Sequence, residues 1–233
     1  MKYKRILLKL SGEALMGDKQ YGIDTEKLNE YSQEIKKVVD KGCEVAIVIG
    51  GGNFWRGRTG TEIERTKADS IGMLATVMNC VYVSEVFRTA DIKTSIYNSF
   101  ECGDIAGLFV KDRVLDDLNN GKVVFLSGGT GHPYFSTDTA TVLRAIEIEA
   151  DSILLAKAID GVYDSDPLKN GNAKKFDSIT LKEVVQKGLQ VVDMTASVLA
   201  MENKMPMLVF KLNEKDSIIN AISDKFNGTK VNV

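Results

Sequence analysis

The sequence alternates along its length between short β-rich segments and amphipathic segments of helical periodicity, and this alternation constrains the fold more than any other feature. Asp24 is the expected N-cap of a helix whose apolar residues fall at helical spacing and which ends at Gly42. Strands are predicted at residues 4–10, 45–49, 92–97, 123–126, 153–156 and 207–210. Such an alternation is typical of a mostly parallel sheet with helices on both faces, so the predicted class is α/β.

Local end signals indicate two further helices and one long loop. Asp138 is the expected N-cap of a helix that runs through Glu149, and Thr180 with Glu183 forms a capping box for a later helix. The segment 160–175 is rich in Gly and Asp, and an excursion of that length is more often a binding loop or disordered than a plain connection. No linker interrupts the chain, so residues 1–233 are expected to form a single domain.

Charge and cysteine content argue against several classes of protein. The 30 basic and 32 acidic residues give a net charge of −2, which lacks the broad positive field of a protein dedicated to nucleic acid. No segment approaches the roughly 20 apolar residues of a membrane span, and the short apolar run at the N-terminus is interrupted by Lys9 and lacks a cleavage-site pattern. Cys43, Cys80 and Cys102 form no CxxC pair, so we expect free thiols in the cytoplasm.

Three glycine-rich loops each follow a predicted strand: Leu10-Ser11-Gly12, Gly50-Gly51-Gly52-Asn53 and Ser127-Gly128-Gly129-Thr130-Gly131. Ligands of open parallel sheets bind beyond the carboxyl ends of the strands, where glycine lets backbone N–H groups approach an anion. Any one loop is equally well explained as a turn, but the three together favour phosphate binding. Neither GxxxxGK[ST] nor GxGxxG is present, which disfavours a Walker-type ATPase and a dinucleotide enzyme.

Lys9 is the first candidate catalytic residue, because an ammonium group is unexpected near the end of an otherwise apolar strand. From a strand end it can neutralise phosphate charge, as phosphoryl transfer requires. The alternative is a lysine that extends to solvent from an edge strand. Arg56 and Arg58 follow the glycine triplet and could clamp phosphate oxygens, although one of them can equally be solvated. Asp138 could orient Lys9 in addition to capping its helix.

Acidic residues and the single histidine limit the chemistry further. Asp160, Asp164 and Asp166 could hold Mg²⁺ through its waters, or they are solvated turn residues. His132 is the only histidine, so a two-histidine metal site has no second imidazole. Chemistry by positioning and charge fits the sequence better.

Taken in order, several motifs resemble those of the bacterial uridylate kinases, within the amino acid kinase superfamily. They are KRILLKLSGEAL at 4–15, YGID at 21–24, VIGGGN at 48–53, GMLATVMN at 72–79, TGHPYFSTDT at 130–139, EIEAD at 147–151 and DGVYDSDP at 160–167. The resemblance covers the chain from about residue 4 to its end. It implies a three-layer αβα fold with a mostly parallel sheet, a homohexamer, and the transfer of a phosphoryl group from ATP to UMP with Mg²⁺. The acceptor part would span roughly 1–150 and the ATP part 151–233.

The resemblance also implies site residues. Lys9, Arg56 and Asp138 would be catalytic. Residues facing ATP would be Lys9, Leu10, Ser11, Gly12, Gly52, Arg56, Lys157, Tyr163 and Asp166. Residues holding UMP would be Gly51, Asp69, Thr130, Gly131, His132, Pro133, Tyr134, Phe135, Ser136 and Thr137, with Asp69 on the ribose hydroxyls. No protein ligand to Mg²⁺ is assigned.

Regulation and two departures complete what the resemblance implies. The family is typically activated by GTP and inhibited by UTP, and a region linked to GTP overlaps Gly17, Asp18, Lys19, Gln20, Tyr21 and Gly22. His132 stands where the family usually has Asn, and Lys157 lies in a variable stretch near the adenine. Two alternatives stay open: a relative that phosphorylates a carboxylate or carbamate, and a nucleotide-binding protein without catalysis.

Overall fold

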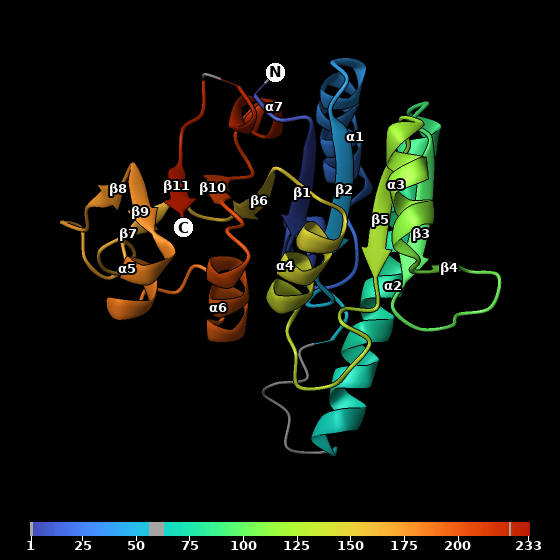
Figure 1. Ribbon diagram of the computed structural model, residues 1–233, viewed down its shortest axis with the longest axis horizontal. Coiled ribbons are helices and arrows are strands. Elements are labelled where there is room, and N and C mark those ends of the chain that lie inside the picture. The colour runs from blue at the N-terminus through green and yellow to red at the C-terminus, as the bar shows by residue number, and fades with distance from the viewer. Residues whose placement is uncertain (1, 56–62, 224) are drawn as a thin grey trace.

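The computed structural model describes residues 2–55, 63–223 and 225–233, so the predictions made for Arg56 and Arg58 lie outside the described residues. Within these ranges, nine strands form one sheet in the order β4-β3-β5-β2-β1-β6-β10-β11-β9 (Figure 1). The strands are β1 (Arg5–Leu10), β2 (Glu44–Ile49), β3 (Thr94–Asn98), β4 (Gly107–Leu108), β5 (Val123–Ser127), β6 (Ser152–Lys157), β9 (Ser178–Thr180), β10 (Met207–Lys211) and β11 (Thr229–Asn232). A separate hairpin pairs β7 (Val162–Tyr163) with β8 (Lys175–Phe176).

Helices cover both faces of this sheet, which confirms the αβα layers. The helices are η1 (Gly12–Leu15, a 3-10 turn), α1 (Thr25–Asp40), α2 (Arg65–Thr89), α3 (Lys111–Asn119), α4 (Thr137–Glu147), α5 (Leu181–Gln186), α6 (Met194–Glu202) and α7 (Ser217–Ala221). One core cluster joins Ile6, Leu8 and Leu10 of β1 to α1, α2 and α7. The other joins Leu7 of β1 to α3, α4, α5 and α6. Successive strand residues point to opposite faces, so β1 contributes to both clusters.

The sheet is parallel from β4 to β10, and only β10 and β11 pair antiparallel. β1 lies in its interior, hydrogen-bonded to β2 on one side and β6 on the other. The alternative of an edge-strand lysine at position 9 is therefore wrong. The carboxyl ends of β1, β2, β5 and β6 meet at the same edge of the sheet, as parallel pairing requires (Figure 1).

Two expectations about helix ends need correction. The N-cap of α4 is Ser136, whose hydroxyl accepts from the backbone N–H groups of Asp138 and Thr139, and the helix ends at Glu147 rather than Glu149. Asp138 lies one residue inside α4, and its carboxylate contacts Lys9 of β1. The other cap predictions are confirmed, because Asp24 caps α1 and Thr180 with Glu183 forms the capping box of α5.

Helix α2 is the one described helix that is long and apolar enough, by length and composition alone, to cross a membrane. It instead packs against the sheet, with Cys80, Val83 and Phe87 fully buried in the core. Buried polar residues on the same helix, Asn79 and Ser84, make hydrogen bonds inside the protein. α2 is therefore a core helix.

Candidate active site

A buried ion pair lies at the carboxyl end of β1. The Lys9 Nζ atom is 2.8 Å from an Asp138 carboxylate oxygen, and the two side chains are only 10% and 20% exposed. β1 and the first turn of α4 position the pair from opposite directions. Two charges buried in this way have to compensate one another. The pair also places an ammonium group at the carboxyl ends of the strands.

The glycine loops after β1 and β2 pack directly on each other. A Cβ atom at Gly12 would lie 2.6 Å from the Gly52 amide nitrogen and 2.7 Å from the Gly50 carbonyl oxygen. A Cβ atom at Gly51 would lie 2.8 Å from the Gly72 carbonyl oxygen of α2. Both loops therefore need glycine because backbone approaches backbone, and this close approach brings backbone amides to the strand ends beside Lys9.

The first pocket opens beside Lys9 and has a volume of about 380 Å³. It is lined by Lys9, Gly51, Gly52, Trp55, Ala68, Asp69, Gly72, Met73, Thr76, Gly129, His132, Phe135, Ser136, Thr137 and Asp138. We call it the acceptor-side pocket. It brings together β1, the glycine loops after β2 and β5, the first turns of α2 and the start of α4, so most residues expected at a UMP site share one cavity.

Asp69 crosses the mouth of this pocket from α2 to the loop before α4. Its carboxylate accepts hydrogen bonds from Arg65 Nε at 2.7 Å and from the Tyr134 backbone N–H at 2.8 Å. Tyr134 is held at a φ of 72°, an unusual conformation for a side chain of that size, and its ring lies beneath the Arg65 guanidinium. Tyr134 thus fixes the loop to α2, but it does not line the pocket.

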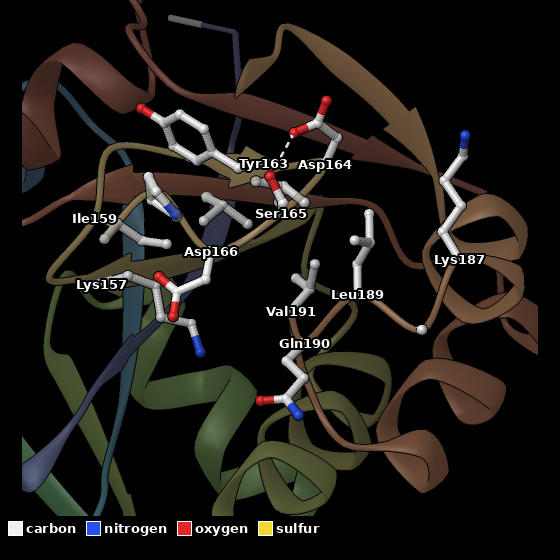
Figure 2. Close-up of a pocket in the computed structure, with 15 residues that line it drawn as sticks. Lys157, Ile159, Tyr163, Asp164, Ser165, Asp166, Lys187, Leu189, Gln190 and Val191 are labelled. Carbon is white, nitrogen blue, oxygen red and sulfur yellow. Dashed lines mark hydrogen bonds between the residues drawn. The ribbon is translucent and has the colours of Figure 1, made fainter. Parts of the chain in front are cut away.

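A second pocket, of about 480 Å³, lies between β6, the β7–β8 hairpin and the segment after α5. Figure 2 shows Lys157 and Asp166 on one side, and Leu189, Gln190 and Val191 on the other. Leu189 and Val191 give it an apolar wall, while Lys157 supplies a cation. We call it the donor-side pocket. The predicted binding loop at 160–175 is therefore an ordered hairpin with its turns at a cavity.

A third cavity joins these two pockets. It has a volume of about 520 Å³ and shares Asp138 with the acceptor-side pocket and Lys157, Gly188, Leu189, Gln190 and Val191 with the donor-side pocket. Burial lowers the pKa of Lys157, and the neighbouring charge of Lys9 lowers it further, while Asp138 opposes both. Two lysines and one aspartate therefore stand where the two pockets meet, a place suited to a group that carries negative charge.

Asp193 links the two sides and was not singled out from the sequence. It caps α6, and its carboxylate also accepts hydrogen bonds from the hydroxyls of Ser136 and Thr139 at the start of α4. It precedes a helix as an N-cap residue, which is the only sequence signal it gives. Trp55 and Thr76 were also missed, although each lines the acceptor-side pocket.

Some predicted residues lie near the pockets without lining them. Leu10 ends β1, Ser11 and Gly12 begin the turn η1, and Thr130, Gly131 and Pro133 are in the loop after β5. All six lie outside the lining of the three cavities. Tyr163 lines the donor-side pocket, but its hydroxyl donates to Asp160 at 2.7 Å.

The described residues contain no group of three His, Cys, Asp or Glu side chains able to hold a metal ion. Asp160 instead pairs with Lys175 at 2.9 Å, and Asp164 accepts from the backbone N–H of Lys174. Asp166 accepts from the backbone N–H of Leu168 within its own turn. These contacts are the ones expected of aspartates that serve turns and an ion pair.

Comparison with known proteins gives a consistent picture. The profile of the Amino acid kinase family matches residues 4–211. The solved UMP kinase from Bacillus anthracis is 36% identical and superposes with a TM-score of 0.96, covering 100% of this chain and 97% of that one. The UMP kinase from Ureaplasma parvum is 33% identical with a TM-score of 0.94, and each chain is covered completely.

Proposed function

The chain belongs to the amino acid kinase family, and we propose that it is a UMP kinase, which transfers the γ-phosphoryl group of ATP to the phosphate of UMP and gives ADP and UDP. The observation that carries this proposal is the pair of pockets that meet at Lys9, Asp138 and Lys157. Phosphoryl transfer needs two bound nucleotides in line and cations between them. The full-length likeness to two UMP kinases selects UMP as the acceptor.

Lys9 stabilises negative charge on the transferring group, and Asp138 keeps its ammonium group in place. The UMP phosphate is already ionised at neutral pH, so the reaction requires no general base. Catalysis then rests on positioning and electrostatic stabilisation by groups that are fixed before the substrates arrive. The 2.8 Å ion pair and its burial support this role. Arg56, which the resemblance assigns to the same step, follows the glycine triplet in the sequence.

UMP occupies the acceptor-side pocket. Asp69 faces the ribose hydroxyls. Its hydrogen bonds to Arg65 and Tyr134 fix the carboxylate in position for this contact. Gly51 and Thr137 approach the UMP phosphate, and the loop at 128–131 with His132 faces the base. The acceptor part of the single domain is thus residues 1–150.

ATP occupies the donor-side pocket, which residues of the 151–233 part line, and the joining cavity, to which Asp138 also contributes. Leu189 and Val191 offer an apolar wall to the adenine, and Lys157 meets the phosphates. Mg²⁺ neutralises phosphate charge when it is bound. Because the described residues supply no cluster of metal ligands, we expect it to arrive with ATP, held by phosphate oxygens and water.

We further propose that GTP activates and UTP inhibits the enzyme, with GTP acting through the segment 17–22. Its last residue is tied to the second glycine loop, because the Gly22 N–H donates to the Asn53 carbonyl and the Asn53 side chain donates to the Gly22 carbonyl. Tyr21 also packs edge-on against Phe54 at 5.4 Å. A ligand that moved this segment would therefore also shift the glycine loop after β2, which lies beside Lys9.

A homohexamer in the cytoplasm completes the proposal. Helix α2 carries exposed apolar residues at helical spacing, namely Ile71, Leu74, Met78, Val81 and Tyr82. An apolar stripe of this kind on a soluble enzyme is expected to be covered by another subunit. The three cysteines are free thiols, in agreement with a reducing compartment.

Formation of ADP in the presence of UMP, CMP, glutamate, aspartate or carbamate tests the proposal directly. We expect turnover with UMP to exceed that with the carboxylate and carbamate acceptors by several orders of magnitude. Lys9→Ala should reduce kcat by about 10²–10³-fold with little change in UMP affinity, as for the loss of one charge-stabilising donor. ATP binding without turnover of any acceptor would instead favour a nucleotide-binding protein, and near-normal turnover in Lys9→Ala would contradict the assigned mechanism.

A further inference from the structure

The loop after β5, residues 128–131, has a backbone that needs external support; we call it the acceptor loop. Gly128, Gly129 and Gly131 all have positive φ angles, of 76°, 59° and 80°. Glycine allows these conformations at little steric cost, but it also leaves many others open. Because Gly129 lines the acceptor-side pocket, whatever fixes the acceptor loop also fixes that wall of the pocket.

Ser99, which follows β3, is hydrogen-bonded to this loop and to the end of β5. Its hydroxyl is 2.6 Å from the Gly129 carbonyl oxygen and 3.2 Å from that of Ser127. Its backbone N–H also donates to the Ser127 carbonyl. A Cβ atom at Gly131 would lie 3.2 Å from Ser99, so the two segments are in close contact along the loop.

Arg144 on α4 sets the direction of the Ser99 hydroxyl. Its Nη2 atom donates to the Ser99 hydroxyl oxygen at 2.9 Å, and its Nη1 atom is 2.5 Å from a Glu147 carboxylate oxygen. The guanidinium lies 3.9 Å from the centroid of the Phe109 ring, which holds its plane. A guanidinium has no acceptor, so the hydroxyl proton of Ser99 must point away from it and toward the carbonyls of the acceptor loop.

We propose that Arg144, acting through Ser99, is a positioning residue for UMP, because it fixes the Gly129 wall of the acceptor-side pocket. The inference rests on the proposed function and deepens it. Arg144 is absent from the described lining of all three cavities, so it acts on the pocket only through Ser99. Its effect should therefore fall on acceptor affinity and leave the ATP side unchanged.

Arg5 offers a matched control for a merely structural role. It is 8% exposed, as Arg144 is, and it also donates to a carboxylate, that of Glu44, and to a backbone carbonyl, that of Ile148. Arg5 is the first residue of β1, so it lies at the amino ends of the strands, whereas the pockets lie at their carboxyl ends. Arg5→Lys and Arg144→Lys thus make the same chemical change in two similar networks, only one of which reaches the acceptor loop.

The experiment measures KM for UMP, KM for ATP, kcat and Tm in Ser99→Ala, Arg144→Lys, the double variant and Arg5→Lys. Ser99→Ala and Arg144→Lys should each raise KM for UMP by about threefold to tenfold, the effect of one lost hydrogen bond, with kcat and KM for ATP within about twofold of wild type. The double variant should be no worse than the worse single variant, because both act along one path. Trp55, the only tryptophan, lines the same pocket and reports UMP binding at equilibrium by its fluorescence.

Arg5→Lys should lower Tm without changing KM for UMP. An unchanged KM for UMP in both Ser99→Ala and Arg144→Lys, with only Tm reduced, would overturn the inference. So would equal losses on the UMP and ATP sides. If Arg144→Lys does not fold, Ser99→Ala alone decides, since it removes only a hydroxyl. Wild-type protein that fails to phosphorylate UMP would refute the proposed function instead, so the two failures are distinct.

Discussion

Lys157 and Lys9 lie close together where the pockets meet. Without a bound anion, the two like charges lower the stability of the folded protein. Burial is the larger cause that lowers the Lys157 pKa, and the charge of Lys9 is the next. The negative charge of a phosphate group bound between them would offset both effects. The residue is therefore better suited to the nucleotide complex than to the free protein, as expected of a binding residue.

This placement predicts opposite effects on stability and on binding for Lys157→Met. Without nucleotide, the variant should have a higher Tm than wild type at neutral pH, because it removes a charge that the fold disfavours. KM for ATP should rise by about 10–100-fold, as for the loss of a hydrogen bond to a charged group. Lys211→Met is the control, since Lys211 pairs with Lys157 in the β6–β10 register and lines none of the described cavities.

The stability difference should also depend on pH. The folded-state pKa of Lys157 is below the 10.5 of the unfolded chain, so folding binds its proton less tightly. The cost is therefore fully present below the folded-state pKa and disappears as pH rises toward 10.5. Melting curves from pH 7 to 10.5 should show the two Tm values converging, whereas a constant gap would contradict the assignment.

Gly12 supports a second prediction, from backbone packing. Gly12→Ala places a Cβ atom 2.6 Å from the Gly52 amide nitrogen, so a loop beside Lys9 has to move. We expect a stability loss of about 1–3 kcal/mol and a fall in kcat of about 10²-fold, typical of overpacking and of a misplaced site. Gly171→Ala, which has no atom within 4 Å of the added carbon, should change neither quantity appreciably. Full activity in Gly12→Ala would show that the two loops need not approach this closely.

At the scale of helices and strands, the central strands and α1 could be predicted because burial patterns and caps agreed with each other. The cap of α4 could not, because Ser136, Thr137 and Asp138 are all good N-cap residues, and the contact that engages Asp138 is with Lys9, distant in sequence. The short strands β4, β9 and β11 give too few residues for a periodic signal, and their pairing is decided by tertiary contacts. The acceptor-side pocket was foreseen through its motifs, whereas Trp55 and Asp193 depend on contacts distant in sequence.

Asp193 supports a prediction at this scale, because one carboxylate joins the starts of α4 and α6. Asp193→Ala removes the cap of α6 and the acceptor for Thr139 at 3.1 Å, so we expect about 1–3 kcal/mol lower stability. Since α4 also carries Asp138, kcat should fall by about tenfold or more. Asp24→Ala, which removes the cap of α1, is the control and should lower stability by about 1 kcal/mol with kcat unchanged in the absence of GTP. Equal activity losses in both variants would mean that Asp193 acts only through stability.

At the scale of the whole molecule, α2 connects the acceptor-side pocket with the outer surface. Asp69, Met73 and Thr76 line the pocket, while an apolar stripe on the opposite side of the helix is between 38% and 55% exposed. A rigid helix with a pocket on one face and a subunit contact on the other would transmit a change in assembly to acceptor binding. This is the physical route by which a hexamer could regulate the enzyme.

The stripe therefore predicts the oligomeric state. Leu74→Glu combined with Met78→Glu places two charges where a second α2 would pack, and burying them there without partners is strongly unfavourable. We expect light scattering after gel filtration to show wild-type protein as a hexamer and the double variant as a smaller species with the same circular dichroism spectrum. Leu168→Glu is the control, because Leu168 is 88% exposed on the hairpin turn and far from the stripe in sequence. If the double variant keeps the wild-type mass, α2 is not part of the subunit interface. The proposed route from assembly to the acceptor-side pocket would then also be wrong.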